Sequence, residues 1–597
     1  MQGTNKNTAR LQAPDFCCVK EALEIVQRLN TSLDPCANFH DFVCMRRLSD
    51  INSTDVSPLF RMAVYRANLE YSRGSLASPS GRALSRLHRS CVQQNWRFEV
   101  ALADFTSAIM STSKVTARMS AADVVKFLAL MSLRYRLPGL VTFRETYNRN
   151  SSQTTSLALS KWDSIPPMLN TSCFKCIEFM ITTFNAILKV DLKASALMNF
   201  HDAVFVYYTH GYNTTNRSLS DSPFRSLSPN AWLDIINEFV YPVYPDAKYI
   251  IRETGTDLDD LTVHLAKPSN QPIAVAYLVI QTVMAIYQEF VDLNAFSHPS
   301  HKADCSSLVL QVSELQESFE AQIVATPARD DHVREIVDVV RKQVTSDALS
   351  SFTFSEEDHL RISETLGSIE VRLPRDVAIA DKPSPEITFN FPADLLEARS
   401  FGFEVQQEKV RKKLNNLKLQ SYMPDVFRRD NIISIPGSMY LMLKFGSKRK
   451  LFANLAVLGV RLARELWSFL LENQTWTNKT MQKIQSFQLC FANPDFTKTG
   501  VNVAGRSARL MAAALASIVK AASKSNWLHV EHISNSVHMS QGQLFHLVLA
   551  DSLCGDIIAQ LPAEDVNVPA KNTPDFSEVF GCAPDAAMNS NQSLCPV

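Results

Sequence analysis

The chain has 597 residues, of which 46% are hydrophobic and 20% charged, and its 60 basic side chains balance 60 acidic ones. A chain of this length can bury a large core and is expected to form several lobes or two large domains. Because the net charge is zero, no long-range field attracts nucleic acid or an anionic membrane, and neither is expected as a partner.

Cysteines and glycosylation sequons indicate a secretory route. The twelve cysteines are an even number and gather towards the two chain ends. Cys173 and Cys176 form the only C-x-x-C pair, so a local disulfide is expected there rather than a zinc site. Residues 1–15 contain no apolar segment, so either the chain begins downstream of a signal peptide or anchor, or it is not secreted. Nine Asn-x-Ser/Thr sequons favour secretion; they lie at Asn30, Asn52, Asn150, Asn170, Asn213, Asn216, Asn473, Asn478 and Asn591.

The first two thirds of the chain predict mainly helices. Residues 18–44 begin with an amphipathic helix, followed by a Leu-Asp-Pro-Cys turn and two aromatic residues before Cys44. Strand-like alternation is confined to residues 140–147 and 370–373. The proline-containing residues 382–392 indicate a boundary between lobes. The predicted helices cover residues 57–71, 84–92, 121–134, 176–192, 231–239, 273–293, 306–325 and 331–350.

Residues 451–471 (LFANLAVLGVRLARELWSFLL) form an almost unbroken apolar run with three charges near its middle. The run is long enough to cross a bilayer, but each central Arg would cost about 2.5–3.5 kcal/mol there, so a buried core helix is expected instead. Arg461 and Glu465 are one helical turn apart, and we expect them to form an ion pair.

Both ends of the chain resemble the neprilysin (M13) family of zinc endopeptidases. Residues 18–44, with the Pro-Cys, the two aromatics and the second Cys, look like the start of that family. Residues 543–554 (QLFHLVLADSLC) and 576–595 (FSEVFGCAPDAAMNSNQSLC) are similar to its closing segments, and residues 431–440 (NIISIPGSMY) to one of its strands.

The resemblance implies a mainly α, two-lobe, disulfide-stapled fold. It places an N-terminal segment, residues 17–47, against a catalytic-type lobe formed by residues 396–597, with a helical cap lobe at residues 48–395. The family's register also implies the disulfides Cys36–Cys582, Cys44–Cys554, Cys490–Cys595, Cys91–Cys305 and Cys173–Cys176. Cys17 and Cys18 are left to form a strained vicinal bridge.

The zinc helix of this family needs His-Glu-x-x-His, with two His ligands one turn apart and a Glu between them as general base. The chain has no such motif. Aligning residues 452–456 with the family places the first His on Arg461, the general base on Leu462 and the second His on Glu465. The resemblance therefore implies that the helix has lost its metal ligands.

The other segments that carry catalytic residues in the family also have different residues in this chain. The third zinc ligand falls on Val501 and the Asp that supports the site falls on Gly505. The His that stabilises the transition state falls on Ala559 or Gln560, and the substrate-binding Arg on Asp565. Residues 423–427 (MPDVF) replace the motif that holds the substrate backbone.

One other histidine cluster is present. His529, His532 and His538 lack either zincin spacing, and we expect them on a surface loop before the helix at residue 543.

These losses predict a secreted neprilysin-like pseudo-peptidase that needs no metal or other cofactor and binds or sequesters peptides or a protein partner in the cleft between the lobes. One alternative is an active M13-type zinc peptidase with non-standard ligands, and another is a scaffold whose cleft is occluded. We expect the chain to be extracellular, or the ectodomain of a membrane protein whose anchor lies outside it, since no membrane segment is visible.

Overall fold

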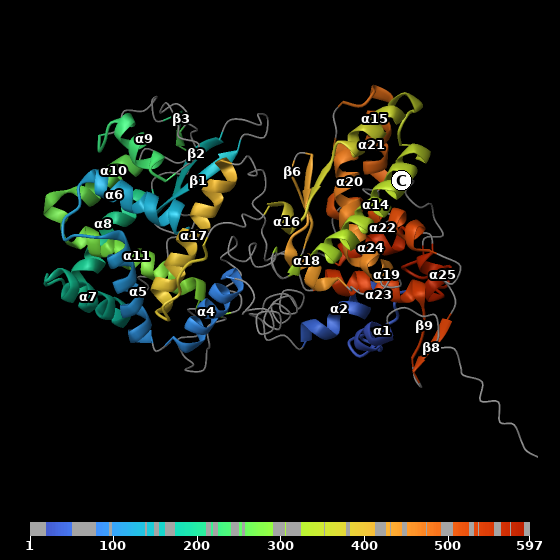
Figure 1. The fold of residues 1–597 in the computed structure, drawn as a ribbon, viewed down its shortest axis with the longest axis horizontal. Helices are drawn as coiled ribbons and strands as arrows, with labels where there is room; N and C mark the ends of the chain where they lie inside the picture. Colours follow the sequence, from blue (N-terminus) through green and yellow to red (C-terminus); the bar gives the residue numbers. More distant parts are fainter. Residues whose placement is uncertain are drawn as a thin grey trace, which may run out of the picture. The chain divides into compact units, whose positions relative to one another are not determined.

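The computed structural model describes most of the chain (Figure 1). The described residues are 19–49, 79–94, 98–137, 140–147, 155–161, 174–209, 217–218, 225–239, 250–252, 257–290, 305, 321, 324–351, 353–377, 383–411, 425–429, 431–443, 451–472, 475–490, 506–523, 530–534, 537–554, 563–573 and 575–589. The chain divides into two compact units, each with its own core.

Unit 1 comprises Met1–Leu69, Glu320–Asp376 and Leu419–Val597. It contains a three-stranded sheet in the order β5-β7-β6, in which β7 is parallel to β5 and antiparallel to β6, and a separate β8-β9 hairpin. Its elements are α1 (Val19–Val26), α2 (Phe39–Ser49), α14 (Pro327–Ser350), η9 (Glu356–Asp358), α15 (His359–Gly367), β5 (Glu370–Arg372), α16 (Pro374–Val377), β6 (Phe427–Arg429), β7 (Ile432–Ser434), α18 (Gly437–Met442), α19 (Leu451–Asn454), η11 (Leu455–Gly459), α20 (Val460–Glu472), α21 (Asn478–Cys490), α22 (Arg506–Ala522), β8 (Val530–Ser534), β9 (Val537–Ser540), α23 (Gln541–Leu553), α24 (Glu564–Lys571) and α25 (Phe576–Phe580).

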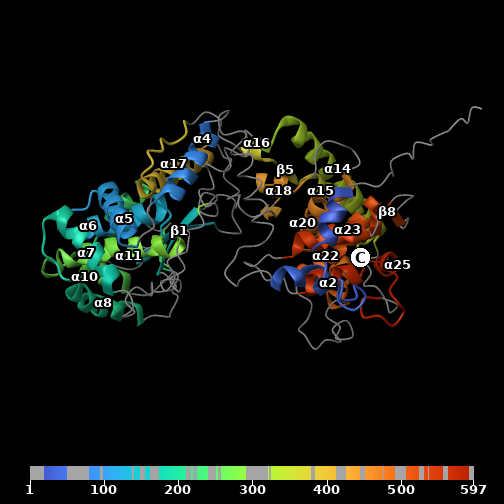
Figure 2. The same ribbon diagram turned by 90° about the horizontal axis from the view of Figure 1, so that it is seen from below.

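The core of unit 1 is built around α20, which packs against α14 and α22 (Figure 1, Figure 2). Leu462, Leu466 and Leu470 follow one another at four-residue spacing and are all buried, as a helix with one apolar face requires. Trp467 is also buried, and its indole N–H donates to Ser517 Oγ on α22 at 3.1 Å. The buried helix predicted at residues 451–471 is confirmed, with the π-helical turn η11 between α19 and α20.

The N-terminal segment is fastened to unit 1 at several points. Phe39 on α2 packs edge-on against Phe576, with ring centroids 5.0 Å apart. The backbone N–H of His40 donates to Asn567 Oδ1 at 2.8 Å. The disulfides Cys36–Cys582 and Cys44–Cys554 join the same segment to the C-terminal residues. This arrangement combines apolar burial with covalent links between segments more than 500 residues apart in the chain.

Unit 2 comprises Glu70–Phe319 and Val377–Lys418. Its helices enclose α11, whose residues from Ala274 to Ile286 are almost all buried, and its four-stranded sheet has the order β1-β2-β4-β3. Its elements are α4 (Pro79–Gln93), α5 (Phe98–Ser113), α6 (Ala121–Ala129), η1 (Leu130–Arg134), β1 (Val141–Tyr147), β2 (Thr155–Lys161), α7 (Phe174–Leu188), α8 (Ala194–Thr209), β3 (Arg217–Ser218), α9 (Pro229–Asn237), β4 (Ile250–Arg252), α10 (Asp257–Ala266), η6 (Pro268–Asn270), α11 (Ile273–Phe290) and α17 (Phe391–Arg411).

The units divide the chain differently from the predicted ranges 48–395 and 396–597. Residues 320–376 belong with the C-terminal third, because Val333, Ile336 and Val340 on α14 are buried where this helix packs on α20 and α22. Residues 377–418 belong with unit 2, because α17 packs on α4 and α5, where Phe391 meets Phe105 edge-on.

Strands at 140–147 and 370–373 are confirmed as β1 and β5. The expected loop carrying the histidine cluster is wrong: β8 and β9 form an antiparallel hairpin in which His532 pairs with His538. Alternating Val, His, Ile and Met residues favour a strand there, whereas the sequence prediction considered only metal spacing. The helix predicted at 57–71, most of that at 306–325 and His529 lie outside the described residues.

Three of the implied disulfides are confirmed: Cys36–Cys582, Cys44–Cys554 and Cys91–Cys305. Cys176 is also disulfide-bonded, while its expected partner Cys173 lies outside the described residues. Cys17, Cys18, Cys595 and the side chain of Cys490 lie outside them as well, so those pairings stay predictions. None of the helices in the described ranges is long and apolar enough to cross a membrane.

Candidate functional site

Arg461 occupies the position that the family resemblance assigns to the first zinc-binding His. The residue is 4% exposed, and its guanidinium runs back along α20 to donate to the Val457 carbonyl at 2.7 Å. It also donates to Ser552 Oγ at 3.0 Å and to the Ser552 carbonyl at 2.8 Å. Nε lies 3.6 Å from Asp425 Oδ1. A permanently charged side chain is therefore held at this position by groups from three segments of unit 1.

Glu465, at the position of the second His, belongs to a network of charges. Its Oε1 accepts a hydrogen bond from Arg464 Nε at 2.9 Å, and its Oε2 lies 3.7 Å from Arg428 Nε. Arg464 Nη2 reaches both carboxylate oxygens of Asp425 at 3.1 Å. Asp425 thus links Arg461 to Arg464, and Arg464 links that carboxylate to Glu465.

The prediction that Arg461 and Glu465 pair directly with each other is therefore wrong, because each side chain has other partners. Side chains of a helix lean towards its N-terminus, so the Arg461 guanidinium turns back towards Val457 and away from the next turn. Glu465 instead pairs with its chain neighbour Arg464 and with Arg428 of strand β6.

Burial governs the protonation of this network. It raises the pKa of Glu465, an effect that the Arg464 charge and hydrogen bond partly offset. Burial alone would lower the pKa of Arg464, but Asp425 and Glu465 outweigh it and raise that pKa further. The guanidinium of Arg464 therefore stays charged throughout the range in which carboxylates and histidines titrate.

Leu462, aligned with the general-base Glu, is 2% exposed and forms part of the apolar core. Asp425 belongs to the segment that replaces the family's backbone-binding motif, and its salt bridges attach this segment to α20. The positions aligned with the metal ligand, the general base and the substrate grip thus contact one another or the core. Val501, Gly505, Ala559 and Gln560 lie outside the described residues.

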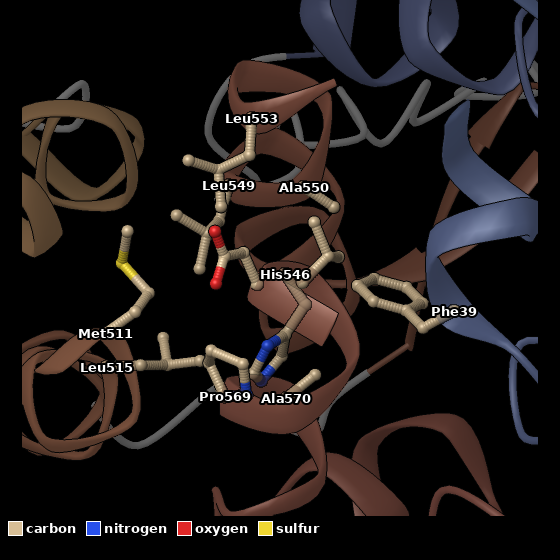
Figure 3. A pocket seen from close by; sticks show the side chains of 11 residues that line it. Phe39, Met511, Leu515, His546, Leu549, Ala550, Leu553, Pro569 and Ala570 are labelled. Atoms are coloured by element: carbon tan, nitrogen blue, oxygen red, sulfur yellow. The ribbon is translucent and has the colours of Figure 1, made fainter. Parts of the chain in front are cut away.

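Asp565, aligned with the substrate-binding Arg, is 3% exposed at the start of α24. It lines a small cavity of about 10 Å³ together with Phe39, His546 and Leu549, whose side chains are labelled in Figure 3. This volume is about that of one water molecule. The carboxylate Oδ1 has no hydrogen-bond partner in the part of the chain that the structure describes. Burial raises the pKa of Asp565, while a hydrogen bond from Ser507 and the charge of Arg464 lower it. The charge of Arg464 on α20 therefore affects the ionisation of Asp565 on α24.

This buried carboxylate supports a pH-dependent prediction. Because the folded pKa of Asp565 is raised above its ordinary value of 3.8, ionisation of Asp565 costs stability as the pH rises through the folded pKa. Asp565→Asn is expected to stabilise the fold by about 1 kcal/mol at neutral pH, since it removes a charged buried oxygen without a full set of partners. The gain should shrink as the pH falls towards 3.8.

Denaturant unfolding between pH 4 and pH 8 measures this difference, with Asp585→Asn on an exposed residue of the same unit as the control. A loss of stability in Asp565→Asn that is the same at every pH would show that the ionised carboxylate is needed for the fold.

The residues present do not fit a zinc ion. Arg461 and Leu462 offer no lone pair to a metal, and the carboxylate of Glu465 is already paired with Arg464 and Arg428. Across the described ranges, no three His, Cys, Asp or Glu side chains gather closely enough to hold a metal ion.

Sequence reasoning found the positions of the helix but missed their partners. Asp425, Arg428 and Ser552 are far from α20 in the chain, and a single sequence carries no signal of their proximity. Arg464 stands in the sequence as the third charge of the apolar run, and a charge in such a run is expected to be paired.

Two of the predicted glycosylation sites lie in described residues. Asn478 is exposed at the first position of α21, and Asn30 is half-buried with its Oδ1 accepting from Ser32 Oγ at 2.6 Å. The other seven sequon asparagines lie outside the described residues, so glycosylation stays a prediction.

No protein-family profile matches the chain, and no curated protein sequence matches it. Solved structures do match over almost the whole length. The zinc metalloprotease Zmp1 of Mycobacterium tuberculosis, solved in complex with an inhibitor, is 13% identical with a TM-score of 0.60, covering 94% of this chain and 97% of that one.

Two further structures have similar scores. PepO from Lactobacillus rhamnosis HN001 is 13% identical with a TM-score of 0.58, covering 95% of this chain and 99% of its own. A Haemonchus galactose-containing glycoprotein complex is 13% identical with a TM-score of 0.62, covering 97% and 98%. At this identity the matches establish architecture rather than activity: the chain has the two-domain, mainly helical fold of the neprilysin-like (M13) zinc metalloproteases.

Proposed function

We propose that this chain is a secreted pseudo-peptidase, which binds or sequesters peptides or a protein partner without cleaving them. The proposal takes Arg461, Leu462 and Glu465 as the degenerate zinc motif of a peptidase fold. Under this proposal the chain still binds peptides or a protein partner, as a peptidase would, but cannot hydrolyse a peptide bond.

The observation that carries the proposal is the state of Arg461. Its guanidinium is buried, donates to Val457 and Ser552, and lies beside Asp425. A zinc ion supplies positive charge that activates water for attack on a peptide bond. A guanidinium supplies positive charge too, but it has no open coordination position and no acceptor atom. The charge at this position would therefore stabilise the fold and could not generate a nucleophile.

The neighbouring positions support the same conclusion. Leu462 has no group that could act as a general base, and Glu465 is held between two guanidiniums. General-base catalysis needs a carboxylate that is free to take a proton from water. A carboxylate paired with Arg464 and Arg428 is engaged by cations instead.

We expect the purified full chain to contain no stoichiometric zinc and to leave quenched-fluorescent peptides intact. Elemental analysis and fluorescence measure the two results, each with and without a chelator. Titration of the same peptides by fluorescence anisotropy should give saturable binding. If no peptide binds, the chain is better described as a scaffold with an occluded cleft.

The variant carrying R461H, L462E and E465H is the matched control. It should still be inactive, since Val501 provides no third ligand and neither Ala559 nor Gln560 provides a donor for the transition state. Stoichiometric zinc in the wild type, lost to a chelator together with peptide hydrolysis, would establish the alternative of an active metallopeptidase with other ligands.

Secretion forms part of the proposal. Long-range disulfides persist in oxidising compartments, and two of them join the chain ends here. An exposed Asn478 at the start of α21 suits glycan attachment. Glycosidase treatment of protein made in a secretory cell should lower its mass towards 66.9 kDa, and an unchanged mass would contradict this part of the proposal.

A further inference from the structure

Unit 2 contains a second pocket that is distant in sequence from α20. Its volume is about 390 Å³, within the range of about 300–1,000 Å³ that is typical of small-molecule sites. Tyr135 at the end of η1, Glu386 and Thr388 in the loop before α17, and Leu396 and Glu397 in the first turns of α17 line it. We call it the Tyr135 pocket. All of its lining residues belong to unit 2.

Two exposed glutamates line the Tyr135 pocket. Glu386 and Glu397 are exposed, and neither has an ion pair or side-chain hydrogen bond with any described residue. The N-terminus of α17 contributes about half a positive charge, which is less than either carboxylate. Arg134, the neighbour of Tyr135 in the chain, donates to Ser400 and Glu404.

A third carboxylate fixes the wall of the pocket. Asp394 is 2% exposed, and its oxygens accept from Ser90 Oγ at 2.6 Å, from the Thr388 N–H at 2.7 Å and from Thr388 Oγ1 at 2.9 Å. These bonds hold the loop of Glu386 against the first turn of α17. The backbone that carries the carboxylates of Glu386 and Glu397 is thus held in place by these hydrogen bonds.

Tyr135 supplies an independent sign of a ligand. The residue is 6% exposed, yet its hydroxyl has no hydrogen-bond partner in the described chain. Burial raises its pKa; the charge of Arg134 lowers it, and the charges of Glu397 and Glu404 each raise it by less than Arg134 lowers it, so the hydroxyl remains protonated. Among the described residues, Arg399 donates to the backbone carbonyl of Tyr135 at 3.5 Å and does not contact the hydroxyl.

We propose that the Tyr135 pocket binds an organic cation, an alkylammonium or guanidinium group, as found on a free amine or on a basic side chain of a peptide. Glu386 and Glu397 would pair with the charge, the Tyr135 hydroxyl would accept a hydrogen bond from it, and Leu396 and the phenol ring would cover an aliphatic stem. A metal ion fits less well, because no three acidic or histidine side chains of the described residues converge on one point.

Ligand-observed NMR titrations of the full chain test this pocket. The probes are n-pentylammonium and N-acetyl-lysinamide, with 1-pentanol as the uncharged match and calcium chloride as the metal arm. Both cations should bind saturably and more weakly as sodium chloride is added, since salt screens exposed charges. The tighter of the two indicates whether the natural ligand is a free amine or a peptide side chain.

Variants locate the site. Glu386→Gln and Glu397→Gln should each weaken cation binding about 3–5-fold, as expected for a partly exposed ion pair. Tyr135→Phe should weaken it about 2–5-fold through loss of one hydrogen bond. Glu364→Gln, which removes an exposed glutamate of unit 1, is the matched control and should change nothing.

Three results would overturn the assignment: no saturable binding of either cation, equal binding of 1-pentanol, or full affinity in the Glu386→Gln, Glu397→Gln double variant. Tighter binding of calcium than of either cation, abolished in that double variant, would replace the organic cation by a metal. None of these readouts depends on peptide binding or on the residues of α20.

Discussion

Replacing Arg461 by alanine is expected to lower the free energy of unfolding by about 3–5 kcal/mol. The side chain is 4% exposed and donates to the Val457 carbonyl and to both oxygens of Ser552. Its loss leaves those acceptors buried and opens a cavity in the core of unit 1. It also removes one of the two guanidiniums that neutralise Asp425.

Chemical denaturation followed by circular dichroism measures the change. Arg334→Ala is the matched control, because Arg334 forms an exposed pair with Asp376 in the same unit and should be worth less than about 1 kcal/mol. Arg461→Met separates volume from polarity: it fills most of the space and still leaves the Ser552 carbonyl without its donor. If Arg461→Ala cost no more than Arg334→Ala, the guanidinium would be solvated, and the claim that its charge stabilises the fold would be wrong.

Removing the Cys44–Cys554 disulfide by substituting alanine at both positions is expected to cost about 2–4 kcal/mol. The bridge joins residues 510 apart in sequence. The loop that it closes is nevertheless short, because Cys36–Cys582 already ties the same segments together. Its loss therefore frees only the stretch around α2 and the end of α23, and the N-terminal segment should open first.

Limited proteolysis of the N-terminal segment under native conditions measures that opening. The variant without Cys91–Cys305 is the matched control, since this bridge lies in unit 2 and its loss should leave cleavage near α2 unchanged. Equal cleavage rates in wild type and in the Cys44, Cys554 variant would mean that Phe39 packing and the remaining bridge hold the segment without help.

The sequence by itself determined the features that depend on local pattern and on spacing along the chain. The apolar run of residues 451–471 predicts a buried helix because its hydrophobic residues leave no polar face wide enough for solvent. The strands at residues 140–147 and 370–373 follow from alternation. The register of cysteines at the two ends, combined with the family resemblance, identified three disulfides that the structure contains.

Only the tertiary structure decided which charges meet. Arg461 and Glu465 are one turn apart, and helical spacing made a direct pair available, but Asp425, Arg428 and Ser552 approach from other segments and provide other partners. A buried charged group is stable only where hydrogen-bond and ion-pair partners surround it. Those partners come from segments far apart in the chain, and a local sequence pattern does not show that they lie close together. Packing between helices also depends on tertiary structure, because helix faces fit one another by shape as well as by hydrophobicity. This packing places α14 in unit 1 and brings Tyr135, Glu386 and Glu397 around one pocket.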